Sequence, residues 1–195
     1  MYDFKNILGI IATILVFLGY VPYVRDIING KTKPHIYSWF IWGFVTLLAF
    51  ALQLSDKAGS GAFVTLAAAI MCFVVIFFGF KYKAKVKIVK TDTIFLILAI
   101  ISLGLWIIAK QPVLSILLTV MVDLLGFAPT IRKSWNNPFS ETLSFYYLNS
   151  IRFGLAIIAL QKYSLLTALY PITWLMANTL FALMLIIRRK KLGNF

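Results

Sequence analysis

Residues 18–29 of the chain read LGYVPYVRDIIN, and residues 125–136 read LGFAPTIRKSWN. Each stretch sets a proline inside an apolar run, a basic residue three positions later and an asparagine at its end. A shift of 107 residues pairs Leu18 with Leu125, Gly19 with Gly126, Pro22 with Pro129, Arg25 with Arg132 and Asn29 with Asn136. Apolar helices share leucine and glycine by chance, but a proline, a basic residue and an asparagine at fixed spacing indicate an internal repeat.

The composition is that of a membrane protein. Of the 195 residues, 62% are hydrophobic and the mean hydropathy is +0.93, whereas soluble domains contain about 45–50% apolar residues. A helix needs about 20 predominantly apolar residues to cross the hydrocarbon core. Seven stretches meet this requirement and predict seven membrane-spanning helices, at residues 6–24, 36–54, 61–80, 93–109, 112–131, 143–161 and 165–187.

The loops between these helices explain the net charge of +13. Basic residues gather on one side of the predicted bundle, at Arg25, Lys31, Lys33, Lys81, Lys83, Lys85, Lys87, Lys90, Arg132, Lys133, Arg188, Arg189, Lys190 and Lys191. The other side carries only Lys5, Lys57, Lys110 and Lys162. Since positive loops stay in the cytoplasm, we predict an N-terminus outside and a C-terminus inside. The basic residues then face anionic lipid headgroups, and no nucleic acid partner is implied. The small size and tight loops favour a prokaryotic inner membrane.

The repeat extends beyond the two proline segments, because the same shift places Lys81 on Arg188, at the ends of the third and seventh predicted helices. Helices one to three and five to seven are therefore expected to be two copies of one unit that run in the same direction, with the fourth helix as a linker. This predicts an all-α polytopic fold of two parallel three-helix bundles. The predicted parts are residues 1–84 for the first bundle, 85–111 for the basic loop and linker helix, and 112–195 for the second bundle with its basic tail.

A three-helix unit whose first helix has a proline near its cytoplasmic end, followed by a basic loop and a Ser/Thr-containing entry to the next helix, resembles the PQ-loop superfamily. The 3+1+3 order with an external N-terminus is similar to the SWEET and SemiSWEET-type sugar transporters of that superfamily. The superfamily also includes cystine and cationic amino acid exporters and the KDEL receptors. The resemblance covers residues 6 to about 191. It implies transport by alternating access, with Pro22 and Pro129 as the hinges at which helices bend.

Two departures from the family pattern bear on the substrate. Glutamine normally follows the family's proline, whereas Tyr23 and Thr130 stand in that place here. The sugar transporters of the family place an asparagine in the third helix of each unit. This sequence has Asn178 in the second unit but Met71 at the matching position of the first. A symmetric sugar pocket is therefore not expected.

Asp123 and Arg152 fall near the middle of the fifth and sixth predicted helices. A charge at the bilayer centre costs on the order of 2.5–3.5 kcal/mol on insertion scales, so each should face a cavity or a partner. Three hypotheses stay open. The two charges form a structural ion pair. Alternatively, Arg152 binds a carboxylate or phosphate of the substrate, and Asp123 holds it when the site is empty. In the third hypothesis Asp123 carries a proton inward with the substrate, as the likeness to the cystine exporter implies.

Other polar and aromatic residues of the spans predict the walls of a solute site. The candidates for substrate binding are Trp42, Tyr146, Asn149, Arg152, Trp174 and Asn178. Trp39 lies nearer the predicted cytoplasmic end and is expected to be an interfacial anchor. His35, the only histidine, is expected to be a solvated cap of the second helix, with a gate or proton relay as the alternative. The only cysteine, Cys72, is expected to pack in the core or against lipid.

The sequence contains no nucleotide-binding glycine loop, metal-ligand cluster or Ser/His/Asp set, so we expect neither an enzyme nor a bound cofactor or metal. The prediction is a transporter of a small polar solute, with proton coupling left open. Arg152 favours an amino acid or organic acid over a neutral sugar, and the WFIW stretch at residues 39–42 keeps a nucleoside-like solute as a variant. The alternatives from a different class are a ligand receptor that moves no solute and a membrane partner subunit. Assembly as a homo-oligomer is also left open.

Overall fold

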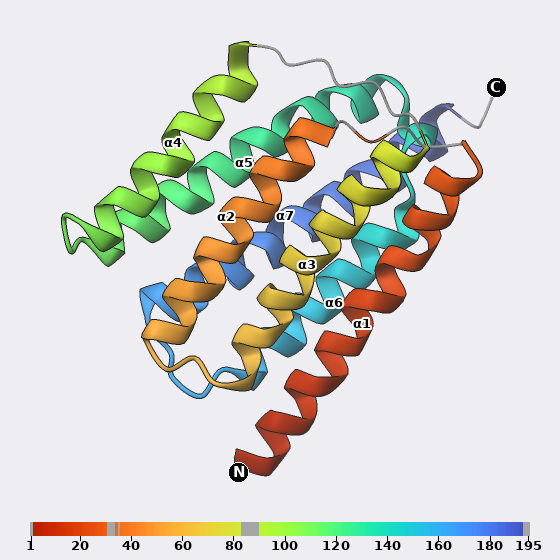
Figure 1. Ribbon diagram of the computed structural model, residues 1–195. Helices are drawn as coiled ribbons and strands as arrows, with labels where there is room; N and C mark the ends of the chain where they lie inside the picture. The colour runs from red at the N-terminus through yellow and green to blue at the C-terminus, as the bar shows by residue number, and fades with distance from the viewer. Residues whose placement is uncertain (1, 31–33, 35, 83–89, 193–195) are drawn as a thin grey trace.

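The structure is a computed structural model that describes residues 2–30, 34, 36–82 and 90–192. This part of the chain forms seven α-helices and one short 3₁₀ helix and contains no β-strand (Figure 1). The helices are α1 (Tyr2–Ile28), α2 (Ile36–Ser55), α3 (Ser60–Lys81), α4 (Lys90–Ile107), α5 (Pro112–Asn136), η1 (Pro138–Ser140), α6 (Leu143–Ala159) and α7 (Leu165–Leu192). Each of the seven predicted apolar stretches coincides with one α-helix, which confirms the all-α fold.

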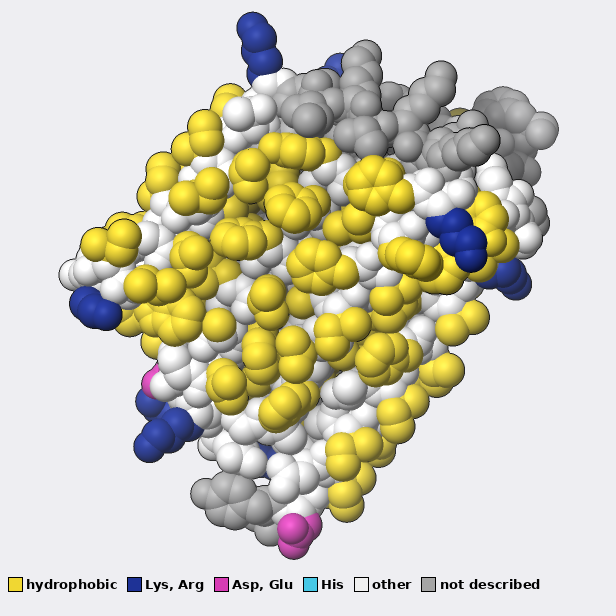
Figure 2. All heavy atoms as spheres, viewed as in Figure 1, with side chains coloured by type: hydrophobic (Ala, Val, Ile, Leu, Met, Phe, Trp, Pro, Cys, Tyr) yellow, Lys and Arg dark blue, Asp and Glu magenta, His cyan; other side chains and the backbone are white. Residues whose placement is uncertain are grey.

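Five of the described helices, α1, α2, α3, α5 and α7, are long and apolar enough to cross a membrane. The apolar parts of α4 and α6 are shorter, at Thr93–Ile107 and Leu143–Ala159. Hydrophobic side chains cover the middle of the face shown in Figure 2, and charged side chains lie toward its ends. Large side chains such as Phe77, Ile100 and Leu180 are more than half exposed, which suits lipid tails but not water. The protein is therefore built to lie in a membrane.

The helices pack in an order that differs from their order in the sequence (Figure 1). Helix α3 packs against both α1 and α2, and α7 packs against both α5 and α6. Contacts between the two halves of the chain join α1 to α6 and α2 to α5, with further contacts between α3 and α6 and between α2 and α7. Helices from both halves of the chain therefore surround the interior.

Buried hydroxyl groups hold α4 to α5. Ser102 Oγ donates to the carbonyl of Ser115 at 2.7 Å and lies 2.6 Å from Thr119 Oγ1. Ser115 Oγ donates in return to the carbonyl of Ser102 at 2.7 Å. Hydroxyl groups inside a bilayer have no water to bond, so such reciprocal bonds favour helix association. Helix α4 also packs on α2, but this hydroxyl cluster attaches it to the second half of the chain.

The prolines of the repeated segments lie inside continuous helices. Pro22 is within α1, near its end at Ile28, and position 129 is within α5, although the side chain of Pro129 lies outside the described residues. A third proline inside a helix, Pro171, is buried in α7, and the sequence prediction does not include it. The hinge role of Pro22 and Pro129 stays a prediction.

Two loops meet at the end of the molecule where the N-terminus lies (Figure 1). Lys162 and Ser164, which follow α6, both donate to the carboxylate of Asp56, which follows α2. The backbone N–H of Gln161 donates to the carbonyl of Ala58 at 2.9 Å. These bonds tie the two halves of the chain together at this end.

Helix α3 comes so close to α6 at Gly61 that no side chain fits between them. A Cβ atom at this position would lie 2.7 Å from the carbonyl oxygen of Ala156 and 3.0 Å from the side chain of Leu160. Because a backbone atom cannot move by a change of rotamer, any larger residue would push the two helices apart.

We expect Gly61→Ala to lower the free energy of unfolding by about 1–3 kcal/mol, since overpacking forces backbone shifts. Thermal unfolding in detergent measures the loss. Gly154→Ala on α6 is the matched control, because a Cβ there meets nothing within 4 Å and alanine favours a helix over glycine. Equal stability of the two variants would contradict the close approach of α3 to α6.

The hydrogen bonds from Lys162 and Ser164 lower the pKa of the Asp56 carboxyl below its ordinary value. A group whose pKa is lower in the folded state stabilises the protein above its unfolded pKa, near 4, and this stability is lost as the pH falls. We therefore expect the melting temperature to drop more between about pH 6 and pH 3 in the wild type than in Asp56→Asn. The difference should be below about 1 kcal/mol, because Lys162 is half exposed. Parallel losses in the two proteins would show that the contact adds no stability.

Candidate functional site

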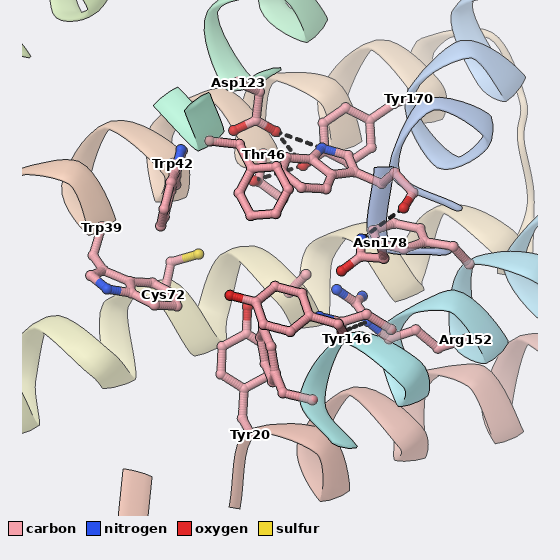
Figure 3. A pocket seen from close by; sticks show the side chains of 16 residues that line it. Tyr20, Trp39, Trp42, Thr46, Cys72, Asp123, Tyr146, Arg152, Tyr170 and Asn178 are labelled. Carbon is pink, nitrogen blue, oxygen red and sulfur yellow. Dashed lines mark hydrogen bonds between the residues drawn. The ribbon is translucent and has the colours of Figure 1, made fainter. Parts of the chain in front are cut away.

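A cavity of about 90 Å³ lies among helices of both halves of the chain. Side chains of α1, α2, α3, α5, α6 and α7 line it (Figure 3). Most of them are aromatic or apolar, and a few polar and charged groups stand between the rings. This combination is typical of sites that bind small molecules.

Aromatic rings gather at the end of the cavity where α2 and α6 begin. Trp39 and Trp42 of α2 pack edge to face with ring centres 5.3 Å apart. Tyr20 of α1 lies 6.1 Å from Trp39 and 5.1 Å from Phe145 of α6 between ring centres. Trp39 is only 7% exposed and lines the cavity. The prediction that it is an interfacial anchor is therefore wrong, because rings of α1 cover it.

Asp123 of α5 lies in the cavity wall with its carboxylate held by two donors of α7. Tyr170 Oη donates to Oδ2 at 3.0 Å, and Trp174 Nε1 donates to the same oxygen at 2.7 Å. Tyr170 has one hydroxyl hydrogen, so Thr46 Oγ1, 2.9 Å away, is the donor in the bond between them. The other carboxylate oxygen, Oδ1, accepts no hydrogen bond from the described residues.

Arg152 of α6 is 3% exposed and lines the same cavity. Its Nε donates to Oδ1 of Asn149, one turn earlier on α6, at 2.6 Å. The guanidinium carbon lies 4.2 Å from the centre of the Phe153 ring. Nη1 is buried and has no hydrogen-bond partner among the described residues. A buried charged group with an unused hydrogen-bond donor is unfavourable until another group supplies an acceptor.

Asp123 and Arg152 do not form the structural ion pair of the first hypothesis. Both line the cavity, but in the described structure each bonds other side chains and no salt bridge joins them. The hypothesis assumed that α5 and α6 are neighbours in space because they are neighbours in sequence. Instead α7 packs against both helices, and its Tyr170 and Trp174 reach the carboxylate.

The structure places all six predicted substrate-binding residues around this cavity, namely Trp42, Tyr146, Asn149, Arg152, Trp174 and Asn178. Asn178 is 2% exposed, and its amide donates to the carbonyl of Trp174 at 2.7 Å. Tyr146 donates to Glu141 at 2.9 Å. The role of these residues in binding stays a prediction. His35 lies outside the described residues, so neither of its predicted roles has a structural counterpart here.

The sequence prediction misses several residues of the cavity wall. Tyr170 is the most important, and a signal for it exists, because Tyr170, Trp174 and Asn178 recur every four residues and so share one face of α7. Cys72 is 4% exposed and also lines the cavity. No spacing indicates that position, because the residues around it in α3 are apolar on all sides of the helix.

Comparison of the chain with models of known protein families, with curated proteins and with solved structures finds no match. The described residues also contain no group of three or more His, Cys, Asp or Glu side chains placed to hold a metal ion. The proposed function therefore rests on the residues that line the cavity.

We expect Trp174→Phe to lower the free energy of unfolding by about 1–3 kcal/mol, because it removes one of two donors to a buried carboxylate. In an Asp123→Asn background the same change should matter less, since the donor then faces a neutral amide. Unfolding of the four proteins of this cycle measures the coupling. Trp42→Phe is the matched control, a cavity-wall tryptophan with no bond to Asp123 in the described structure. Equal losses in both backgrounds would show that the Trp174 ring acts by packing alone.

Proposed function

We propose that this chain is a membrane transporter that carries a small polar solute by alternating access, with an amino acid or organic acid preferred to a sugar. The observation that carries the proposal is the Arg152 guanidinium, buried at a cavity with Nη1 unpartnered among the described residues. A planar guanidinium binds a carboxylate through parallel charge-assisted hydrogen bonds. A solute with a carboxylate would supply the acceptor that the described side chains do not.

The bounds of the helices support two copies of one unit. Shifted by 107 residues, α1, α2 and α3 fall on α5, α6 and α7, and Ile36 at the start of α2 falls on Leu143 at the start of α6. The packing agrees with this relation. In the first unit α1 contacts α6 of the second, and in the second unit the equivalent helix α5 contacts α2 of the first. We therefore propose the 3+1+3 arrangement, with bundles at residues 1–84 and 112–195 and α4 in the linker at 85–111.

The walls of the cavity follow the same repeat. Four pairs of lining residues are related by the shift, namely Tyr20 and Phe127, Trp39 and Tyr146, Trp42 and Asn149, and Thr46 and Phe153. A site that two equivalent units share can open toward either end when one unit rocks against the other, which is what alternating access requires. Pro22 and Pro129 are the hinges in this proposal, by resemblance to the PQ-loop transporters.

The proposed orientation places the N-terminus outside and the C-terminus in the cytoplasm of a prokaryotic cell, in its inner membrane. It follows from the basic residues that end α1, α3 and α7, such as Arg25, Lys81 and Arg189, because positive segments remain on the cytoplasmic side. The contacts of Asp56 with Lys162 and Ser164 would then lie at the outer end.

A thermal-stability screen of the purified protein against amino acids, organic acids, sugars and nucleosides is the first test. A ligand at about 100 times its Kd stabilises the folded state by about 2.7 kcal/mol. We expect carboxylate-bearing compounds to stabilise the wild type and to enter liposomes that contain it. Arg152→Gln should weaken their binding by roughly 10- to 100-fold, since a hydrogen bond to a charged group is lost.

Arg188→Gln is the matched control for this experiment. Arg188 lies at the end of α7, where Nε donates to the carbonyl of Trp135 at 2.9 Å, and this variant should keep binding and flux. Stabilisation by neutral sugars alone, unchanged in Arg152→Gln, would contradict the proposal. Carboxylate binding without flux into liposomes would indicate a receptor of the same fold.

A further inference from the structure

Asp123 is the second charged group of the cavity, and a simple anion bound to Arg152 would leave it unpaired. Both donors that reach Asp123, from Tyr170 and Trp174, bond Oδ2. Oδ1 accepts no hydrogen bond from the described residues, and the side chain is only 1% exposed. Within the described structure, the protein thus holds one oxygen of this carboxylate by two hydrogen bonds and the other by none.

Arg152 likewise has one bonded and one unbonded nitrogen among the described residues. Asn149 fixes Nε, while Nη1 has no partner in the described part of the chain. In the view of Figure 3, Asp123 and Arg152 lie on opposite sides of the cavity, with aromatic rings around the space between them. The site therefore has a negative pole, Asp123, and a positive pole, Arg152. Hydrogen bonds to neighbouring side chains orient each pole, but among the described residues each keeps an atom without a hydrogen bond.

The equivalent positions of the first half of the chain carry no charge. The repeat places Asp123 on Val16 of α1 and Arg152 on Val45 of α2. Both valines are 0% exposed, so apolar side chains fill the equivalent positions of the first half within the same kind of helix packing. Charged residues inside a membrane are unfavourable and are kept for function. Two such charges at positions where valine packs well indicate a ligand.

We propose that the ligand of this cavity is a zwitterion, whose carboxylate binds the guanidinium of Arg152 and whose ammonium group binds the carboxylate of Asp123. This inference rests on the proposed function, because it names the solute class of the same site. A zwitterion pairs both buried charges and adds no net charge, whereas an anion pairs only one of them and a sugar pairs neither. The faces of rings such as Tyr146 and Trp174 can hold the body of the ligand and its cationic end.

The test compares compounds that differ in one pole only. For each of a set of α-amino acids, the probes are the amino acid, the same molecule without its amino group and the same molecule without its carboxylate. Binding is measured as the concentration that raises the melting temperature of the full chain in detergent. We expect at least one amino acid to bind roughly tenfold or more tightly than both of its truncated partners.

Variants locate each pole. In Asp123→Asn the preference for the amino acid over its deaminated partner should disappear, while the deaminated acid binds as it does to the wild type. In Arg152→Gln the preference over the decarboxylated amine should disappear. Asp123→Val, which introduces the residue found at the equivalent position Val16, is a second variant at this position. It replaces Asp123→Asn in the test if that variant does not fold.

The single cysteine reports where the ligand sits. Cys72 lines the cavity, so a compound bound there should slow its alkylation by a small maleimide, measured by mass spectrometry of the intact protein. An amino acid that raises the melting temperature without protecting Cys72 would overturn the inference.

The outcomes separate this inference from the proposed function. Deaminated acids that bind as tightly as amino acids, and that depend on Arg152, would overturn the zwitterion and leave the carboxylate transporter standing. Tighter binding of those acids at low pH would then place a proton on Asp123. If no carboxylate of either kind binds the wild type, both proposals fail.

Discussion

A charge inside a bilayer needs a partner within reach, and this constraint determines the arrangement of the interior. Asp123 receives hydrogen bonds from Tyr170 and Trp174, and the oxygen of Tyr170 accepts in turn from Thr46. These groups come from α2, α5 and α7, so one buried carboxylate connects three helices from both halves of the chain. Among the described residues, Arg152 forms only one such bond. Of the two buried charges, it is therefore the one with fewer hydrogen bonds.

In the proposed arrangement of two equivalent units, a repeated scaffold carries an asymmetric cavity. Helix order, packing and four pairs of cavity residues follow the repeat, yet both charges belong to the second half. A symmetric cavity would offer a ligand two equal poles, as suits a solute with similar ends. Placing unlike charges on two helices of one half gives the cavity a direction, so a solute with unlike ends can bind in one orientation only.

The helices could be predicted from the sequence because hydropathy is a local property, and each predicted span coincides with a helix. The cavity residues could be predicted because polar side chains such as Arg152 and Asn178 are rare within spans and have to avoid lipid. What could not be predicted is which helices touch. The prediction of an ion pair between Asp123 and Arg152 was wrong because α7 packs against both of their helices. The prediction for Trp39 was wrong because Tyr20 of α1 packs against its ring. Both errors concern contacts between distant segments, which no local pattern contains.

The contacts of α1 also affect how the protein is made. Helix α1 packs against α3 and α6, and α6 is synthesised long after α1 enters the membrane. Through most of translation α1 thus lacks one of its two main neighbours and must persist in lipid without it. Its outward residues, including Ile7, Ile10, Ile14 and Leu18, are each about half exposed or more even in the finished fold. The order of biogenesis, and not only the final packing, therefore favours a first helix that lipid alone can accommodate.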